Sequence, residues 1–283
     1  MKKLFAVLLT FVLVFALAAC AGGGAPDPVV PVAPPDPETS PAAEPEPEVN
    51  DNEEVREDRV FQIYSDNAFP PFHMLDIATG EFYGFDVDLI EAIAADQGFR
   101  IERNHVGFAA ALGALEAGQA DGMIAGMSIT EERREIFDFS EGYFQAGQVL
   151  VVPEGSEITD FSDLTGQVLA AKIATVGLSF AEEMAAIYDF EVIAFEDSPT
   201  MYQAVMIGEA VAAIEDRPVI EFAIYQQDNL TLQTVGETLN PRYYGFAVRR
   251  GEFPELIEMF NQGLANLRES GYYYEILARY GLS

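Results

Sequence analysis

The chain contains few of the residues from which enzymes and metal centres are usually built. Its 283 residues include one cysteine, two histidines and no tryptophan. One cysteine cannot form a disulfide framework or a zinc site of paired cysteines, and His73 and His105 are too few for a histidine-rich metal site. The sequence also lacks the phosphate-binding loops and the Gly-x-Ser-x-Gly turn of common enzyme classes. We therefore expect no cofactor, no metal and no enzymatic activity.

Positive charge is also scarce. The chain has 15 Lys and Arg residues against 47 Asp and Glu residues, so its formal net charge is −32. No run of basic residues offers the electrostatic footprint that nucleic-acid binding requires. We therefore expect no nucleic acid among the partners.

The first twenty residues have the pattern of an export signal. Two lysines precede an apolar run over residues 4–17, which is short for a bilayer core of about 30 Å. The run ends in the segment Leu-Ala-Ala-Cys, which resembles a bacterial lipobox and implies diacylation of Cys20. We therefore predict a lipoprotein signal peptide over residues 1–20, and an ordinary secretory signal is the alternative.

Residues 21–58 differ sharply in composition from the rest of the chain. They are rich in Pro, Ala, Glu and Asp and contain no aromatic residue. Such a segment has too little apolar surface to offset the entropy of ordering, so we predict a disordered, semi-rigid acidic linker. Its charge could hold the globular part away from an anionic membrane, and a plain tether is the alternative.

Residues 59–283 alternate strand-like and helix-like patterns and are long enough for one large or two small α/β units. The first series opens with an alternating strand over residues 60–64, and apolar residues at helical spacing run from Phe85 to a stop at Gly98. A second, similar series opens near Phe161. Two such series predict two lobes with a cleft between them, and open α/β sheets bind ligands at the carboxyl ends of their strands.

Three ionisable residues lie at or near the ends of predicted elements. Asp66 follows the first strand, Arg133 lies just inside a helix that Thr130 can cap, and Asp216 closes a buried strand of the second series. A zwitterion needs a forked donor for its carboxylate and an acceptor for its ammonium, which Arg and Asp supply. These residues are therefore candidates for binding a free amino acid.

Hydrogen-bond donors accompany this set. The Ser128 hydroxyl and the backbone N–H groups near Thr175, ahead of a predicted helix, would add donors for an anionic group. The alternative for each ionisable residue is a solvated charge or an ordinary ion pair. Arg133, for example, could pair with Glu131 or Glu135.

The most specific signal is a set of collinear segments. They are Asp66-Asn67-Ala68-Phe69-Pro70-Pro71-Phe72, Gly84-Phe85-Asp86-Val87-Asp88-Leu89, Ala114-Leu115-Glu116-Ala117-Gly118-Gln119-Ala120-Asp121, Ile129-Thr130-Glu131-Glu132-Arg133, Phe137-Asp138-Phe139-Ser140 and Leu267-Arg268-Glu269-Ser270-Gly271-Tyr272. Together they resemble the bacterial amino-acid-binding proteins of ABC importers, solute-binding family 3, over nearly all of residues 60–282.

The resemblance implies an α/β, two-lobed periplasmic binding protein-like fold of type II. Each lobe would be a mixed sheet flanked by helices, and two hinge strands would join the lobes. Lobe 1 would span residues 59–147 and 242–283, and lobe 2 residues 148–241. With the lipobox, the resemblance implies an extracytoplasmic monomer, lipid-anchored to the cell membrane, that delivers a free amino acid to an ABC transporter permease.

The resemblance also implies roles for individual residues. Arg133 matches the arginine that clamps the ligand α-carboxylate, helped by Ser128 and Gly126, and Asp216 matches the acid that receives the α-ammonium. Because Arg133 and Asp216 fall in different lobes, a zwitterion would satisfy both only when the cleft closes.

Aromatic and acidic positions of the family are matched as well. Phe69 and Phe108 match the pair of rings that sandwiches the ligand side chain, and core packing is the alternative for one of them. Asp86 and Asp88 match acids that we assign to the fold and a helix start. The chain departs from the family at residues 174–177, where Gly-Thr is usual, and this bears on how closely the backbone approaches the ligand.

The identity of the ligand depends on charge. Asp66 would repel an acidic ligand and Lys172 a basic one, so we expect a neutral polar amino acid, glutamine first. Basic amino acids (Arg, Lys or His) come second, because Glu215 adds negative potential near the cleft. A sensory lipoprotein, a structural interaction protein and a dehydratase-like enzyme on the same scaffold also remain open. In such an enzyme, only Glu215 or His73 could act as acid or base.

Overall fold

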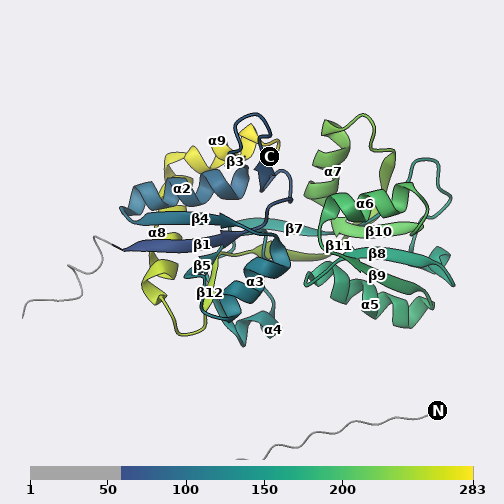
Figure 1. Ribbon diagram of the computed structural model, residues 1–283, viewed down its shortest axis with the longest axis horizontal. Coiled ribbons are helices and arrows are strands. Elements are labelled where there is room, and N and C mark those ends of the chain that lie inside the picture. The colour runs from purple at the N-terminus through teal and green to yellow at the C-terminus, as the bar shows by residue number, and fades with distance from the viewer. Residues whose placement is uncertain (1–58, 283) are drawn as a thin grey trace, which may run out of the picture. The chain divides into compact units, whose positions relative to one another are not determined.

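A computed structural model describes residues 59–282 of the chain (Figure 1), all of which belong to one unit. The predicted signal peptide with Cys20 and the predicted linker lie outside the described residues. Within residues 59–282, no helix combines the length and the apolar character needed to cross a membrane.

The first sheet is formed mainly by the N-terminal half of the described chain. Its strand order is β4-β1-β5-β12-β6. The bounds are β1 Val60–Ser65, β4 Arg100–His105, β5 Gly122–Met123, β6 Phe137–Phe139 and β12 Ala247–Arg249. β1 runs parallel to β4 and β5, whereas β12 runs antiparallel to β5 and β6, so the sheet is mixed as the resemblance implied.

Helices and a small hairpin complete this first lobe. The helices are α2 Phe85–Gln97, α3 Phe108–Glu116, α4 Glu131–Arg134, α8 Pro254–Ser270 and α9 Tyr272–Arg279, and the hairpin is β2 Met74–Leu75 with β3 Phe82–Tyr83. α2 and α9 lie on one side of the lobe and α3 and α4 on the other (Figure 1), and α8 packs against α2 and α9. The C-terminal helices therefore return to the lobe in which the described chain begins.

The second sheet is built from one continuous stretch of chain. Its strand order is β11-β7-β10-β8-β9. The bounds are β7 Phe144–Pro153, β8 Val168–Lys172, β9 Glu191–Phe195, β10 Ala212–Asp216 and β11 Leu232–Tyr244. α6 (Ser198–Met206) and α7 (Arg217–Gln226) lie on one side, and α5 (Val176–Tyr188) lies on the other; a short 3₁₀ turn spans Phe161–Leu164 (Figure 1). β8 is parallel to β9 and β10, and β7 is antiparallel to β10, so this sheet is also mixed.

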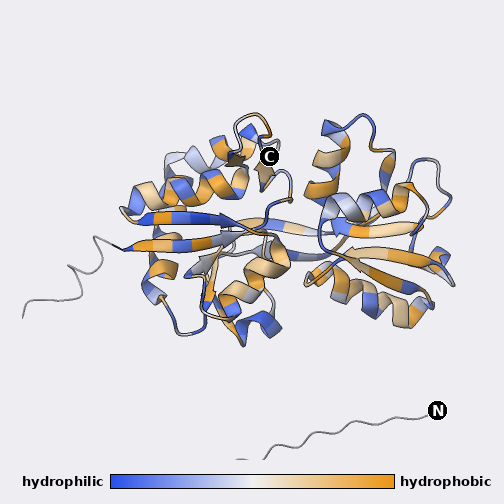
Figure 2. Ribbon diagram, in the orientation of Figure 1, coloured by the Kyte–Doolittle hydropathy of each residue, from blue (hydrophilic) through white to orange (hydrophobic). Residues whose placement is uncertain are grey.

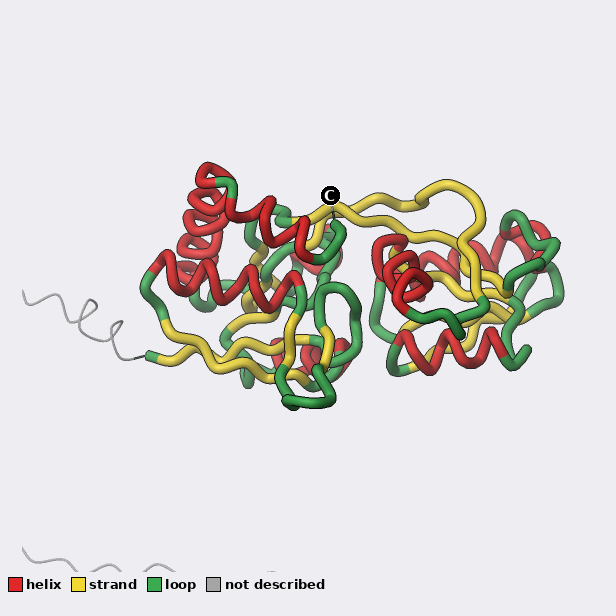
Figure 3. The backbone as a smooth tube through the Cα atoms, turned by 90° about the horizontal axis from the view of Figure 1, so that it is seen from above, coloured by secondary structure: helices red, strands yellow, loops and turns green. Residues whose placement is uncertain are grey.

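Two long strands join the lobes. β7 and β11 pair antiparallel from Leu232 opposite Pro153 to Tyr244 opposite Phe144, with irregularities between Val235 and Arg242. In Figure 3 they are the two yellow strands that run side by side between the lobes. The α/β two-lobed fold with two hinge strands is thus present, while the lobe boundaries given above stay a prediction.

Each lobe has its own apolar core. In lobe 1, the residues expected on one helix face, Phe85, Leu89 and Ile93, are buried and pack with Phe246 and Phe260. The core of lobe 2 contains Val151, Ala170, Met201, Ala213 and Ile220. Figure 2 shows the strands of lobe 2 mainly in orange, as expected for strands covered by helices on both faces.

The glycine-flanked apolar segment over residues 122–126 has the pattern of a buried strand, but only its first two residues form one. β5 ends at Met123, and the backbone at Gly126 makes a hydrogen bond with a side chain instead. The N–H of Gly126, at φ 58°, donates to the carboxylate of Asp86 at 2.8 Å instead of entering a strand ladder. A Cβ at Gly126 would lie 2.4 Å from the ring of Phe69, so this close approach requires glycine.

Candidate functional site

A cavity lies where the two lobes meet. It encloses about 420 Å³ of atom-free space, part of it open to solvent. Eight of the residues predicted to bind ligand line it: Phe69, Phe108, Gly126, Ser128, Arg133, Lys172, Thr175 and Asp216. Ala125, Val176, Gly177, Ile214 and Glu215 complete the lining. The structure therefore brings together residues that are separated by up to about 150 positions in sequence. Of the predicted ligand-binding residues, only Asp66 is not part of the cavity lining.

Arg133 is positioned by the helix start predicted for it. The Thr130 hydroxyl accepts from the N–H of Arg133 at 3.1 Å and caps α4. The guanidinium donates through Nη1 to the Ser128 carbonyl at 2.8 Å and through Nη2 to the Ala174 carbonyl of lobe 2 at 3.0 Å. Burial lowers the pKa of Arg133 to about 10, against an opposing attraction from Asp216. Arg133 thus remains a cation at neutral pH.

The pairings that were the alternative for Arg133 are not formed. Among the described residues, no ion pair joins it to Glu131 or Glu135, and its hydrogen-bond partners are neutral carbonyls. A cation that is held by carbonyls retains its full charge for an incoming anion. Its guanidinium carbon also lies 5.6 Å from the centre of the Phe108 ring, within cation–π range.

Asp216 ends β10 and is held by both hinge strands. Gln148 Nε2 donates to Oδ1 at 2.7 Å, and the Tyr244 hydroxyl donates to Oδ2. Burial raises the pKa of Asp216, and these hydrogen bonds together with Lys172 and Arg133 oppose the rise. The Oε1 atom of Gln148 is buried without a hydrogen-bond partner among the described residues.

Sequence reasoning missed Gln148 and Tyr244. Neither belongs to a motif, because their role depends on strand register and not on a local pattern. Gln148 lies directly opposite Asp216 in the antiparallel ladder, and Tyr244 is bridged to Ser128. A correct prediction of the hinge-strand register would have found the first of them.

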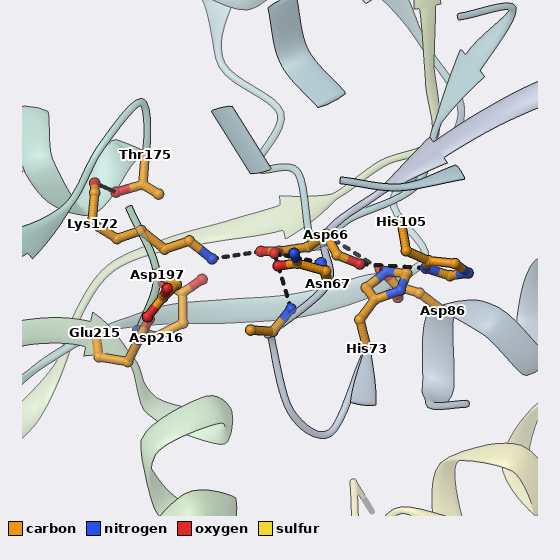
Figure 4. Close-up of polar contacts among 12 residues, drawn as sticks. Asp66, Asn67, His73, Asp86, His105, Lys172, Thr175, Asp197, Glu215 and Asp216 are labelled. Atoms are coloured by element: carbon orange, nitrogen blue, oxygen red, sulfur yellow. Dashed lines mark hydrogen bonds and ion pairs between the residues drawn. The ribbon is translucent and has the colours of Figure 1, made fainter. Parts of the chain in front are cut away.

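Asp66 and Lys172 form a buried ion pair between the lobes. Asp66 follows β1 and Lys172 ends β8, and their side chains meet at 2.5 Å with 1% and 3% of each exposed (Figure 4). The N–H groups of Asn67 and Ala68 donate to the other carboxylate oxygen at 2.7 and 3.2 Å. Burial alone would raise the pKa of Asp66, but Lys172, with smaller contributions from His73 and the Ala68 N–H, outweighs it, and the pKa lies below its usual value.

This ion pair changes the charge argument made from the sequence. Asp66 and Lys172 were expected to act as separate charges, one repelling acidic ligands and one repelling basic ligands. The structure shows that they neutralise each other. Lys172 Nζ also lies 5.0 Å from the ring centre of Phe69 and 5.9 Å from that of Phe108, so the ammonium sits beside the aromatic walls.

The lobe 2 side of the cavity begins a helix. The Thr175 hydroxyl caps α5 by accepting from the N–H of Leu178 at 3.2 Å, and it donates to the Lys172 carbonyl at 2.7 Å. Val176 and Gly177 in the first turn line the cavity. The N-terminus of a helix favours negative charge, so this side suits an anionic group of a ligand.

The comparisons with known proteins agree with this geometry. The profile of the bacterial extracellular solute-binding proteins, family 3, matches residues 61–283. The chain belongs to this family. The same profile covers both lobes, the hinge strands and every residue of the cavity lining.

Relatives and solved structures of the family differ in their ligands. A "Probable histidine-binding protein" of Neisseria gonorrhoeae is 33% identical over 226 residues, covering 78% of this chain and 83% of the relative. The ABC transporter glutamine-binding protein GlnH of Bacillus subtilis is 28% identical and covers 99% and 97%. The structure of an ancestral arginine-binding protein bound to arginine has 33% identity, a TM-score of 0.74 and coverage of 78% and 97%.

Glu215 lines the cavity beside Asp216. Its Oε2 accepts from the Tyr202 hydroxyl at 2.9 Å, and its Oε1 accepts from the backbone N–H of Asp216 at 2.9 Å. Burial and the neighbouring Asp216 raise the pKa of Glu215. Glu215 therefore faces the cavity with both carboxyl oxygens already accepting hydrogen bonds.

Neither histidine reaches the cavity. His73 is fully buried, with Nε2 3.1 Å from Asp86 Oδ2, which also accepts from the Tyr143 hydroxyl at 2.9 Å. His105 stacks on Phe82 with ring centres 3.9 Å apart, and burial, reinforced by His73, lowers its pKa to about 4. Within residues 59–282, no group of three or more His, Cys, Asp or Glu side chains is placed to hold a metal ion.

Proposed function

We propose that this chain is an extracytoplasmic receptor that binds a free polar amino acid by closing its two lobes and delivers it to an ABC transporter permease. The proposal rests on one observation: Arg133 and Asp216 line the same cavity, and each comes from a different lobe. A ligand with a carboxylate and an ammonium complements this arrangement, whereas a simple anion or cation complements half of it.

The two ends of the ligand would be held by different chemistry. Arg133 offers a planar fork to the α-carboxylate, and the N-terminus of α5 adds backbone donors. Asp216 would receive the α-ammonium, and the hinge-strand side chains Gln148 and Tyr244 fix its orientation. Ligand affinity would thus be coupled to the closed state, since both anchors are satisfied only there.

Glutamine best fits the part of the cavity that would hold the ligand side chain. The Asp66–Lys172 pair is neutral overall, so an uncharged side chain is favoured beside it, and Lys172, which lines the cavity, can donate to the carbonyl oxygen of a carboxamide. Phe69 and Phe108 would cover the aliphatic part of the side chain. The glutamine-binding relative, which aligns over 99% of this chain, supports this choice.

A basic amino acid is the second candidate. Glu215 lines the cavity in addition to Asp216. The α-ammonium requires one of these two acidic side chains, so the other could bind a positively charged ligand side chain. The relatives named for histidine and arginine support this reading. A protonated Glu215 would favour glutamine and an ionised Glu215 would favour a cationic side chain, so this residue decides between the two candidates.

Attachment to the membrane is part of the proposal. The Leu-Ala-Ala-Cys segment supports lipid modification of Cys20, with residues 21–58 as a linker and a monomeric binding domain beyond it. Metabolic labelling with a radioactive fatty acid would test the anchor. Label in the native chain and its loss in Cys20→Ser are expected, while label retained in Cys20→Ser would contradict it.

An enzyme on the same scaffold requires an acid–base pair in the cavity. Of the two candidates, Glu215 lines it and His73 does not. A sensory receptor would share the site and feed no transporter. Uptake of labelled amino acid by cells that lack this chain separates delivery from sensing, because loss of uptake supports delivery and unchanged uptake supports sensing.

The ligand itself can be found by thermal unfolding of the full chain with each of the twenty amino acids. A ligand at 100 times its Kd stabilises the folded state by about 2.7 kcal/mol. The unfolding midpoint should rise with glutamine, or with arginine, lysine or histidine if the second candidate holds. A flat response to all twenty would contradict the proposal.

A further inference from the structure

The positive charges of the described chain differ in how they are neutralised. Six of them pair with a carboxylate: Arg59, Arg103, Lys172, Arg217, Arg249 and Arg279. Three others, Arg134, Arg242 and Arg268, form no ion pair with any described carboxylate, and they line the same surface pocket. In a chain with a net charge of −32, three unpaired guanidiniums at one place call for a physical explanation.

This pocket lies on the opposite side of the backbone from the ligand cavity. Ile129 and Tyr243 line the pocket, and their backbones are bonded by the Ile129 N–H and the Tyr243 carbonyl at 2.8 Å. The residues adjacent to these two face the other way: Ser128 lines the ligand cavity, and Tyr244 bonds to Asp216. Successive side chains of extended backbone point to opposite faces, so the two sites share a wall.

The guanidiniums in the pocket have few partners. Nε of Arg242 is buried with no hydrogen-bond partner among the described residues, so this guanidinium is only partly satisfied by the protein. Arg268 donates to the Gly142 carbonyl at 3.0 Å, and the exposed Arg134 lies over the Phe139 ring at 5.8 Å. Glu141 is the carboxylate in the lining, so three positive charges face one negative charge.

We propose that this pocket, formed by Arg134, Arg242 and Arg268, binds a small polyvalent oxyanion of the phosphate class. Guanidinium groups match the geometry of phosphate oxygens in paired hydrogen bonds, and several of them converge where planar recognition of an anion is needed. The pocket holds about 1090 Å³ of atom-free space, partly open to solvent, which leaves room for an organic group attached to the phosphate.

The positive charge of the pocket also acts on Arg133 in the ligand cavity. Burial is the main cause that lowers the pKa of Arg133, and repulsion from Arg242 adds to it, so the positive charge of the pocket reaches the ligand cavity. An anion beside Arg242 would cancel this repulsion. The proposal does not depend on which amino acid the cavity binds, or on whether it binds one.

Calorimetric titration of the purified full chain with pyrophosphate, at fixed ionic strength and against a sodium chloride blank, tests the site. We expect one bound anion per chain and a loss of about tenfold or more in affinity in Arg134→Gln, and a larger loss in Arg134→Gln/Arg268→Gln. Glu141→Gln should tighten binding, because it removes the opposing carboxylate.

A matched control lies elsewhere on lobe 1. Arg249→Gln removes an exposed arginine that pairs with Glu252 outside the pocket, and it should leave pyrophosphate affinity unchanged. The far-ultraviolet circular dichroism of each variant verifies folding. Absence of heat beyond the salt blank, or affinity in Arg134→Gln/Arg268→Gln equal to that of the native chain, would overturn the proposal.

A second experiment identifies where the phosphate comes from. Glycerol phosphate in solution and vesicles of anionic phospholipid present the same chemical group from two sources. Binding of glycerol phosphate that requires Arg134 and Arg268 supports a free phosphate compound, and binding of vesicles alone with the same requirement supports a lipid headgroup. If neither binds through these arginines while pyrophosphate does, the site takes inorganic phosphates and both organic sources are excluded.

Discussion

The carboxylate of Asp66 meets the ammonium of Lys172 at 2.5 Å, although one residue follows a strand of the first sheet and the other ends a strand of the second. The pair is almost completely buried between the lobes. When the lobes separate, both charges can return to water, which offsets the attraction that is lost. The pair therefore contributes to the balance between open and closed arrangements more than to the stability of either lobe.

Substitution of Lys172 by Met should weaken ligand binding more than it weakens folding. Closure would bury Asp66 without a partner, and removing one member of a buried charge pair costs about 2–5 kcal/mol in binding free energy. The unfolding midpoint in urea should change little, because open lobes solvate Asp66. Calorimetric titration together with urea unfolding measures the two effects separately.

The double variant Asp66→Asn/Lys172→Met provides the control for this prediction. It removes both charges, so closure no longer buries an unpaired carboxylate and part of the affinity should return. Arg249→Met, which breaks an exposed pair within one lobe, should have little effect on either measurement. Equal losses in urea stability and in affinity for Lys172→Met would show that the pair stabilises the fold itself.

Arg133→Ala should reduce amino-acid affinity by about 2–5 kcal/mol, because the α-carboxylate would be buried without its cation. Arg133→Lys should recover only part of this loss, since an ammonium cannot make two parallel hydrogen bonds. The matched control is Arg134→Ala, the next residue on α4, which does not line the cavity. Titration of all three variants with the best ligand gives the comparison, and tight binding by Arg133→Ala would disprove the clamp.

Acid should weaken ligand binding at a higher pH than an ordinary aspartate would suggest. Burial raises the pKa of Asp216 above its ordinary 3.8, so the ligand-free carboxyl takes up a proton earlier as pH falls. The ligand ammonium requires the ionised carboxylate, so binding in this range must release a proton. Calorimetry in two buffers of different ionisation enthalpy measures that release.

The variant Glu215→Gln distinguishes between the two carboxyl groups whose pKa is raised, those of Asp216 and Glu215. If Asp216 is responsible, proton release persists in this variant, and its loss would assign the effect to Glu215. Affinity that stays constant as pH falls to 3.8, with no proton released, would contradict a role of either carboxyl in holding the ammonium.

His105 should make folding sensitive to acid. Its pKa is about 4 in the folded protein against 6.5 for the free side chain, because burial disfavours the imidazolium. As pH falls below 6.5 the unfolded chain gains the proton first, so this contribution to stability is complete above 6.5 and is lost toward about 4. His105→Phe keeps the stacking on Phe82 and removes the titration. Its thermal unfolding midpoint should fall less over this range, and an equal fall in both proteins would exclude His105.

Local signals in the sequence were sufficient for the parts of the site that lie next to helix and strand ends. Thr130 precedes an acidic helix start, and the structure shows its hydroxyl capping Arg133. Asp216 was placed at the end of a buried strand, and it closes β10. Such positions are predictable because capping and strand termination depend on neighbouring residues.

Relationships between lobes were not predictable in the same way. The Asp66–Lys172 pair joins residues 106 positions apart, and the hold of Tyr244 on Asp216 depends on how two strands align. His73 gave no sign that it would be fully buried against Asp86. Each of these contacts depends on tertiary packing, which sets the environment of a side chain independently of its nearest neighbours in sequence.

The position of β12 affects how a newly made chain folds. The sheet of lobe 2 uses residues 144–244 without interruption, whereas the sheet of lobe 1 needs β12 between β5 and β6. The sheet of lobe 2 can therefore form from its own stretch of chain, while the sheet of lobe 1 exposes the edge of β5 until β12 is in place. An unpaired strand edge is prone to association with other chains, so lobe 1 is the more vulnerable of the two during folding.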